Sequence, residues 1–114
     1  MAADSTVIML KALDALAARA TISAQNIANA GSPNYRPARL SFEQALRDAA
    51  ALGNEAVAAV TPHTERLSLD EPGARQRLDL ELATASTTAL RYGALITMLG
   101  RQMQIESLAV AGNS

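Results

Sequence analysis

Residues 82–103, LATASTTALRYGALITMLGRQM, carry the strongest helical pattern in the chain. Apolar side chains recur there every three or four positions, which places them on one stripe of an α-helix. The stripe consists of Leu82, Ala85, Ala89, Tyr92, Ile96, Leu99 and Met103. The surrounding residues predict a helix from roughly Asp79 to Val110, ending before the Gly112-Asn113 pair.

A second stripe with the same spacing lies near the other end of the chain. It consists of Leu10, Leu13, Ala17, Ala20, Ala24 and Ile27. It predicts a helix from about Ser5 to Asn29, with Asp4 or Ser5 as its N-cap. Both stripes fit a heptad seam, so the sequence predicts a mainly α fold whose long N- and C-terminal helices pair as a coiled-coil-like hairpin. The single module divides into an N-terminal helix (1–30), an irregular centre (31–78) and a C-terminal helix (79–114).

Further apolar residues lie off these two stripes. They are Ile8, Met9 and Ile22 in the first helix and Leu90, Leu95 and Ile105 in the second. Two interpretations remain open: these side chains pack under the central segment of the same chain, or they pack against neighbouring subunits. We favour self-assembly, because the centre looks too polar and too interrupted to cover a hairpin about 40 Å long.

The central segment predicts one short helix and one short strand. Ser41-Phe42-Glu43-Gln44 has a capping-box pattern and predicts a helix near residues 42–52, with Gly53-Asn54 as its stop. The apolar face of this helix would be formed by Phe42, Ala45, Leu46 and Ala49. The alternation at 66–70 predicts a strand, and Glu71-Pro72-Gly73 predicts a turn. Residues 55–60 fit either a helix or a loop.

Composition argues against several classes of function. The 114 residues carry 10 basic and 11 acidic side chains, so no excess of positive charge is available to capture nucleic acid or anionic lipid. The chain has no cysteine and one histidine, His63, which leaves neither thiolate nor imidazole-rich metal sites. No apolar run is long enough to span a membrane, and the N-terminal residues do not have the pattern of a cleaved signal peptide.

No motif of an enzyme or of a cofactor-binding protein is present. His63 and Asp70 could belong to a Ser-His-Asp set, but no nucleophile elbow or glycine-rich oxyanion segment accompanies them. Asp79 and Glu81 are spaced i,i+2, and we interpret both as solvated acids at a helix start, where the dipole favours them. We expect no catalytic residue, cofactor, metal or small-molecule substrate.

The most informative short stretch is Asn26-Ile27-Ala28-Asn29-Ala30-Gly31-Ser32-Pro33-Asn34-Tyr35. Asn is a poor residue for a helix interior, yet two lie at i,i+3 at the end of the first helix, where they can bond its last carbonyls or a neighbouring backbone. Gly31 could take the left-handed position after the helix, and Ser32–Tyr35 suits a turn in which Asn34 tolerates the left-handed region. An ordinary helix stop explains these residues about as well as a functional motif does.

This stretch resembles the "NIAN-x-x-TPGY" signature of flagellar rod, hook and hook-associated proteins. The matching positions are Asn26, Ile27, Ala28, Asn29, Pro33 and Tyr35, while Ser32 and Asn34 replace the usual Thr and Gly and Gly31 lies between. Ala89-Leu90-Arg91-Tyr92 is similar to the "SLRYQ" start of the C-terminal helix in the FlgB family of proximal-rod proteins. The acidic segment that usually precedes this helix is shortened to Leu78-Asp79-Leu80-Glu81, which keeps the related FlgC family open.

The resemblance implies a structural subunit rather than an enzyme. Such proteins are exported by the flagellar type III apparatus without a cleaved signal and polymerise into the periplasmic rod of the basal body. Their partners are other copies of the same chain and other rod and export-gate proteins, with no nucleic acid and no membrane insertion. A different class also fits the two stripes: a small helical-hairpin adaptor or chaperone that forms a discrete dimer or bundle.

Overall fold

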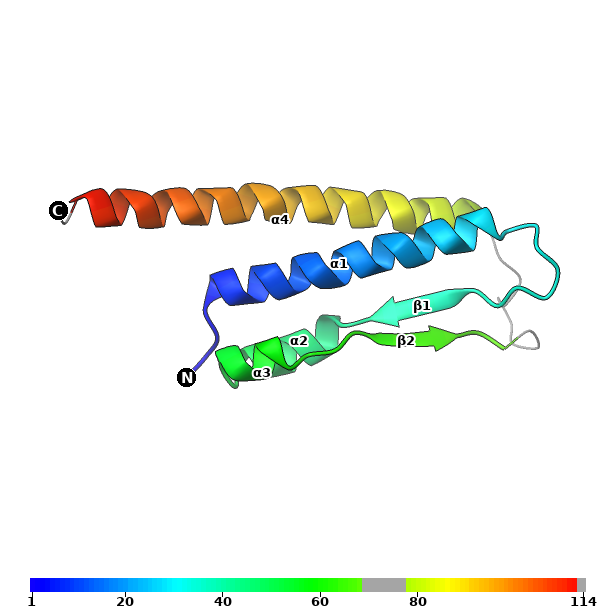
Figure 1. The fold of residues 1–114 in the computed structure, drawn as a ribbon, viewed down its shortest axis with the longest axis horizontal. Helices are drawn as coiled ribbons and strands as arrows, with labels where there is room; N and C mark the ends of the chain where they lie inside the picture. Colours follow the sequence, from blue (N-terminus) through cyan, green and yellow to red (C-terminus); the bar gives the residue numbers. More distant parts are fainter. Residues whose placement is uncertain (69–77, 113–114) are drawn as a thin grey trace.

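The computed structural model of the chain describes residues 1–68 and 78–112. The molecule is elongated, with extents of 63 × 25 × 15 Å (Figure 1). Its elements in chain order are α1 (Ser5–Ala28), β1 (Ala38–Ser41), α2 (Glu43–Ala50), α3 (Asn54–Ala58), β2 (His63–Arg66) and α4 (Leu78–Gly112). The mainly α hairpin predicted from the two periodic stretches is confirmed, since α1 and α4 are long helices that pack against each other.

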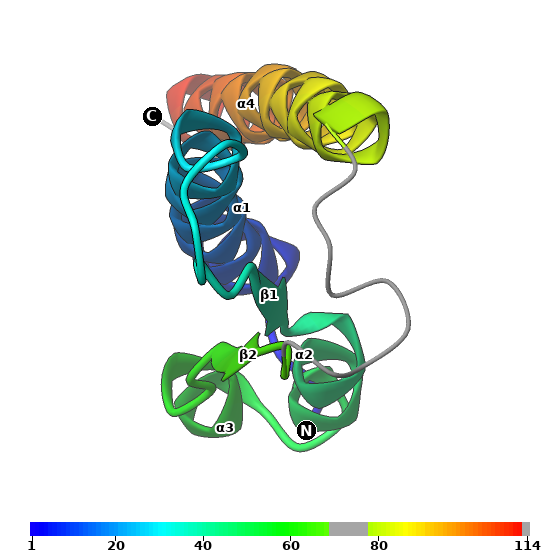
Figure 2. The same cartoon turned by 90° about the vertical axis from the view of Figure 1, so that its right-hand side faces the viewer.

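The elements form three layers with α1 in the middle (Figure 2). α4 covers one side of α1, and the small central elements cover the opposite side. In this central layer β1 and β2 pair antiparallel, from Ala38 opposite Arg66 to Ser41 opposite His63. The backbone pairing continues by one bond, because the amide of Leu67 donates to the carbonyl of Pro37 at 3.0 Å.

The hydrophobic core lies between α1 and the central layer. Ala15 and Leu16 of α1 meet Leu40 of β1, Leu46 of α2 and Val57 of α3, and Phe42 and Ala49 complete the buried cluster. Val57 is fully buried and Leu16 is 3% exposed. The apolar face expected on the short helix is present at Phe42, Leu46 and Ala49, whereas Ala45 is exposed.

Part of the apolar surface that lies off the two stripes is therefore buried within the chain. Met9 is buried, and Ile8, Ile22 and Leu95 pack half-buried against the core cluster. Leu90 and Ile105 remain 74% and 63% exposed. Packing under the central segment is thus the correct interpretation for α1, because the strand pair and two short helices cover more of that helix than the broken sequence suggests.

The two periodic stripes do not form a buried seam between α1 and α4. Leu13 is the buried member on α1, with Ile27 half-buried; Ala85 and Leu99 are half-buried on α4. The other members are exposed: Leu10, Ala17, Ala20, Ala24, Leu82, Ala89, Tyr92, Ile96 and Met103. The expected heptad seam is therefore buried within the chain only in part, because α1 directs Ala15 and Leu16 toward the central layer.

Neither expected capping bond forms, although Asp4 does occupy the N-cap of α1 as predicted. Ser41 lies in β1 opposite His63 and does not cap the next helix. Phe42 occupies the N-cap of α2, and its amide donates to Oε1 of Glu43 at 3.4 Å. Asp4 occupies the N-cap of α1 without a capping bond. Its amide instead donates to Oδ1 of Asn54 at 2.8 Å, and its carboxylate accepts from Nδ2 of Asn54 at 3.0 Å. Both expected capping residues, Ser41 and Asp4, thus take long-range partners instead.

The central segment also departs from its expected boundaries. The strand predicted at 66–70 forms earlier, at His63–Arg66, because β1 pairs with those residues. Positions 69–73, including the predicted turn, lie outside the described residues. α3 resolves the ambiguity at 55–60 in favour of a short helix. Gly53 ends the preceding turn with a φ of 122°, as its predicted stop role requires.

Candidate functional site

The buried side chain of Asn26 connects α1 to three other parts of the fold. It is fully buried, and its Nδ2 donates to the carbonyl of Ala38 at 2.9 Å and to Oε1 of Glu81 at 3.1 Å. Its Oδ1 accepts from the amide of Ala38 at 3.1 Å and from the hydroxyl of Tyr35 at 3.0 Å. The side chain of Asn26 therefore ties α1 to β1, to the turn before β1 and to the start of α4.

The other motif residues shape the end of α1. Nδ2 of Asn29 donates to the carbonyl of Gln25 at 2.9 Å, and the Ser32 hydroxyl donates to Oδ1 of Asn29 at 3.2 Å. The expected bond from an Asn to the last helical carbonyls is thus confirmed at Asn29. Asn34 adopts a φ of 63°, in agreement with the turn predicted there, whereas Gly31 does not take the left-handed position expected of it. The exposed residues of the stretch are Ala28, Ala30, Gly31, Ser32, Pro33 and Asn34.

The sequence did not predict the contacts that Glu81 makes. It is 3% exposed, accepts from Asn26 and lies 3.2 Å from Nη1 of Arg39, so it is not the solvated acid expected at a helix start. We call Asn26, Arg39 and Glu81 the latch. Its members are far apart in the sequence, and the signal that could have found it is the amide of Asn26 inside a helix, because a buried amide needs polar partners.

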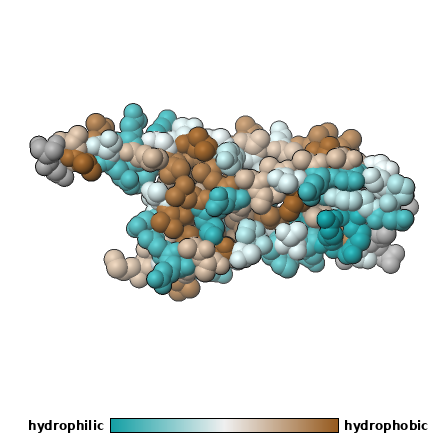
Figure 3. Space-filling model, viewed as in Figure 1, coloured by the Kyte–Doolittle hydropathy of each residue, from teal (hydrophilic) through white to brown (hydrophobic). Residues whose placement is uncertain are grey.

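The exposed stripe residues of α1 and α4 lie along one side of the hairpin. We call the following set the seam face: Leu10, Ala17, Ala20 and Ala24 of α1 with Leu82, Ala89, Tyr92, Ile96 and Met103 of α4. A cavity of about 360 Å³ between the helices is lined by Ala17 and Ala20 on one side and Ala89 and Tyr92 on the other, which places the two stripes beside each other. Hydrophobic surface gathers where α4 runs beside α1 (Figure 3). No member of the seam face carries a charge.

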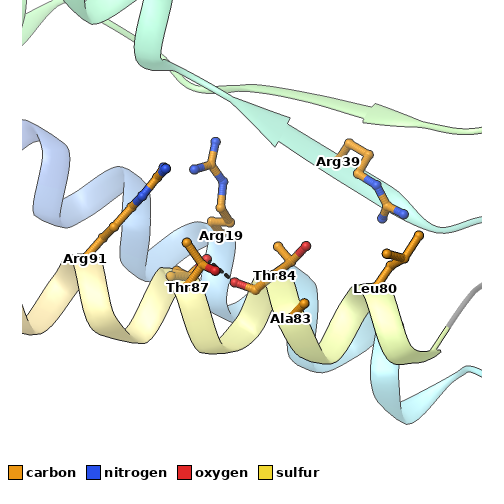
Figure 4. A pocket seen from close by; sticks show the side chains of 8 residues that line it. Arg19, Arg39, Leu80, Ala83, Thr84, Thr87 and Arg91 are labelled. Carbon is orange, nitrogen blue, oxygen red and sulfur yellow. Dashed lines mark hydrogen bonds between the residues drawn. The ribbon is translucent and has the colours of Figure 1, made fainter.

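A second cavity, of about 490 Å³, combines arginines with threonines (Figure 4). We call it the arginine pocket: Arg19 from α1 and Arg39 from β1 face Thr84, Thr87 and Arg91 of α4. Arg19 donates to both carboxylate oxygens of Glu43, at 2.7 and 2.8 Å, and to the carbonyl of Leu40 at 2.8 Å. The guanidinium of Arg19 also lies 4.8 Å from the centre of the Phe42 ring.

Glu43 is the titratable group most affected by this arrangement. Its hydrogen bonds with Arg19 lower the pKa of Glu43 from 4.5 to about 2. Arg91 adds a longer contact, with its Nη1 3.6 Å from Oε2 of Glu43. Within the described residues Arg91 makes no hydrogen bond, and its side chain is 59% exposed. Arg91 is therefore a cation whose hydrogen-bond donors remain free within this part of the chain.

A third cavity, of about 460 Å³, is predominantly apolar and adjoins the arginine pocket at Arg91. We call it the helix groove, because α1, α2 and α4 form its walls. Its lining includes Ile8 and Leu16 of α1, Leu46 and Ala50 of α2, and Leu95 and Met98 of α4, with Glu43, Arg47 and Arg91 also present.

Among residues 1–68 and 78–112, no group of three or more acids or histidines lies close enough to hold a metal ion. In the same part of the chain, no helix has the length and apolarity needed to cross a bilayer. His63 is exposed on β2 opposite Ser41, and Asp70 lies outside the described residues.

No protein-family model matches the chain, and no curated protein matches it closely enough to be a relative.

Proposed function

We propose that this chain is a structural, non-enzymatic subunit of the bacterial flagellar basal-body rod, of the proximal-rod type represented by FlgB. It would reach the periplasm through the type III export apparatus and join other copies of itself and other rod and export-gate proteins. Its terminal helices would form the contacts from which the torque-transmitting shaft is built. The FlgC type of proximal-rod subunit is the nearest alternative.

The resemblance at Asn26–Tyr35 supports this assignment, and the geometry of that stretch agrees with a structural role. Asn26 and Asn29 bond backbone and side-chain groups that fix the end of α1. A motif whose polar atoms are used in this way organises the hairpin and leaves no reactive group in a cleft.

The observation that carries the proposal is the seam face. Its large α4 members, Tyr92, Ile96 and Met103, are 38%, 48% and 59% exposed, although they recur at helical spacing. Burying apolar surface against another subunit would contribute about 25 cal/mol for each Å² removed from water. An uncharged stripe that runs along both helices suits repeated helix–helix packing better than it suits a solvated surface.

The test is deletion of the gene in its native flagellated host, followed by complementation. We expect the deletion strain to lack flagella and the wild-type gene to restore them. Ile96→Asp should fail to complement, because it places a charge in the seam face, whereas Leu90→Asp should complement, because Leu90 is exposed outside that face. A motile deletion strain with intact rods would refute the rod assignment.

Sedimentation of the purified chain separates a rod subunit from a helical adaptor. A rod subunit should be monomeric when dilute and should form open-ended polymers when concentrated, whereas an adaptor should give one small species at all concentrations.

A further inference from the structure

The C-terminal end of α4 extends beyond the part of the helix that the rest of the chain covers. Gln102 is the last half-buried residue of α4, and every residue from 103 to 112 is exposed. We call residues 103–112 the overhang; in Figure 1 it projects past the start of α1. Its large apolar side chains are 59–72% exposed: Met103, Ile105, Leu108 and Val110.

One face of the overhang has a distinctive composition. Met103, Glu106 and Val110 follow one another at i, i+3 and i+7, so they share a face of α4. Glu106 is the single acid of residues 103–112. The overhang thus presents one carboxylate between two apolar side chains, over about 10 Å of helix.

The helix groove is complementary to that face. Leu46, Leu95 and Met98 supply apolar walls, and Arg91 supplies a cation that makes no hydrogen bond within the described residues. From Arg91 to Met98 is seven residues, about 10 Å, which matches the span from Met103 to Val110. Arg47 of α2 adds a second positive charge among the lining residues, and Glu43, which is bound by Arg19 and lies 3.6 Å from Arg91, is the acid in that lining.

We propose that the overhang of one copy docks into the helix groove of a second copy, with Glu106 paired to Arg91. An overhang cannot enter its own groove, because Met98 and Met103 belong to one continuous helix that cannot fold back on itself. Donor and acceptor surfaces differ, so the contact is heterologous and generates open chains unless its rotation closes a ring. The contact is a mode of self-assembly for the proposed rod subunit. Only its biological purpose rests on the rod function.

Charge exchange between two full-length variants tests the pairing. Arg91→Glu alone places two carboxylates opposite each other at the contact, and Glu106→Arg alone places two guanidinium groups there. We therefore expect each variant to self-associate at least about tenfold more weakly than wild type. In an equimolar mixture, the overhang of the Glu106→Arg variant meets an opposite charge in the groove of the Arg91→Glu variant, so association should recover. The measurement is sedimentation velocity across concentration, with circular dichroism to verify that each variant is folded.

Two further variants test whether a change in association is specific to the proposed contact. Arg101→Glu reverses another exposed charge of α4 outside the helix groove and should associate like wild type. Val110→Asp alters an exposed overhang residue that the fold does not bury, and it should weaken association without changing the melt. If the mixture associates no better than either charge variant alone, or if wild type stays monomeric at high concentration, the docking mode is wrong.

The result is independent of the genetic test. A strain that stays motile without the gene would refute the rod function and leave the charge-exchange result intact. Wild-type association by Arg91→Glu in a protein required for flagella would overturn the docking mode alone, and would assign self-assembly to the seam face.

Discussion

The two long helices have similar apolar sequences but opposite patterns of burial. α1 buries four apolar side chains, Met9, Leu13, Ala15 and Leu16, together with Ser23 and Asn26. The buried residues of α4 are both polar, Glu81 and Thr88, while its large apolar residues are mostly exposed. α1 is covered on two sides and α4 on one. α1 therefore specifies the fold of the single chain, whereas the apolar residues of α4 are available to other chains.

The strongest prediction contrasts the core of α1 with the surface of α4. Leu16→Ala removes a side chain that is 3% exposed and should lower the free energy of unfolding by about 2–5 kcal/mol. Leu90→Ala, at a side chain that is 74% exposed, should change it by less than about 0.5 kcal/mol. Urea denaturation followed by circular dichroism measures both, and equal effects would contradict the contrast.

A second, smaller effect concerns the polar attachment of α4 to α1. Asn26→Ala removes the hydrogen bonds that this side chain makes with the amide of Ala38 and the buried carboxylate of Glu81, so it should destabilise the protein by about 2–3 kcal/mol. Asn29→Ala serves as the matched control; its bonds are exposed, and it should cost about 0.5–1 kcal/mol. Hydrogen exchange should also show faster opening at 78–88 in Asn26→Ala alone. Unchanged exchange there would mean that Asn26 does not hold α4.

The smallest expected effect concerns Glu43, which lies where α2 meets the two long helices. Its ionisation makes the stability of the protein depend on pH. Its pKa falls from 4.5 to about 2 on folding, so its contribution is complete above about pH 5 and is lost as the pH falls toward 2. The carboxylate is 39% exposed, and solvent screening limits the contribution to about 1 kcal/mol. Glu43→Gln should therefore be less stable than wild type at pH 7 and nearly equal to it near pH 2. A stability difference that does not shrink on acidification would contradict this origin.

The helices themselves were predictable because their signals are local. The expected span of α1, Ser5–Asn29, ends one residue beyond the observed Ala28, and the expected Asp79–Val110 lies within α4. Periodicity and Asp4 suffice for the start of α1, whereas α4 continues through Gly112, which the sequence predicted to lie beyond its end. A 3-4 spacing, however, shows only that a helix has an apolar stripe and does not show which element covers it.

The errors arise where residues distant in sequence compete with local patterns. Ser41 has the sequence context of a cap, but its pairing with His63 places it in a strand. Glu81 has the sequence context of a helix-start acid, but Asn26, 55 positions away, is its partner. The seam-face residues were found by periodicity, whereas the arginine pocket was not, because Arg19, Arg39 and Arg91 converge only after α4 packs on α1.

The latch and the overhang give α4 the mechanics of a lever. α4 is one continuous helix of 35 residues, with Glu81 buried near one end and residues 103–112 exposed at the other. If Gln102, the last half-buried residue of α4, acts as the fulcrum, the exposed arm is about 15 Å long and the arm from Gln102 to Glu81 about 32 Å. A sideways force at the tip would therefore reach Glu81 reduced to about half, where the hydrogen bond from Asn26 and the ion pair with Arg39 resist it.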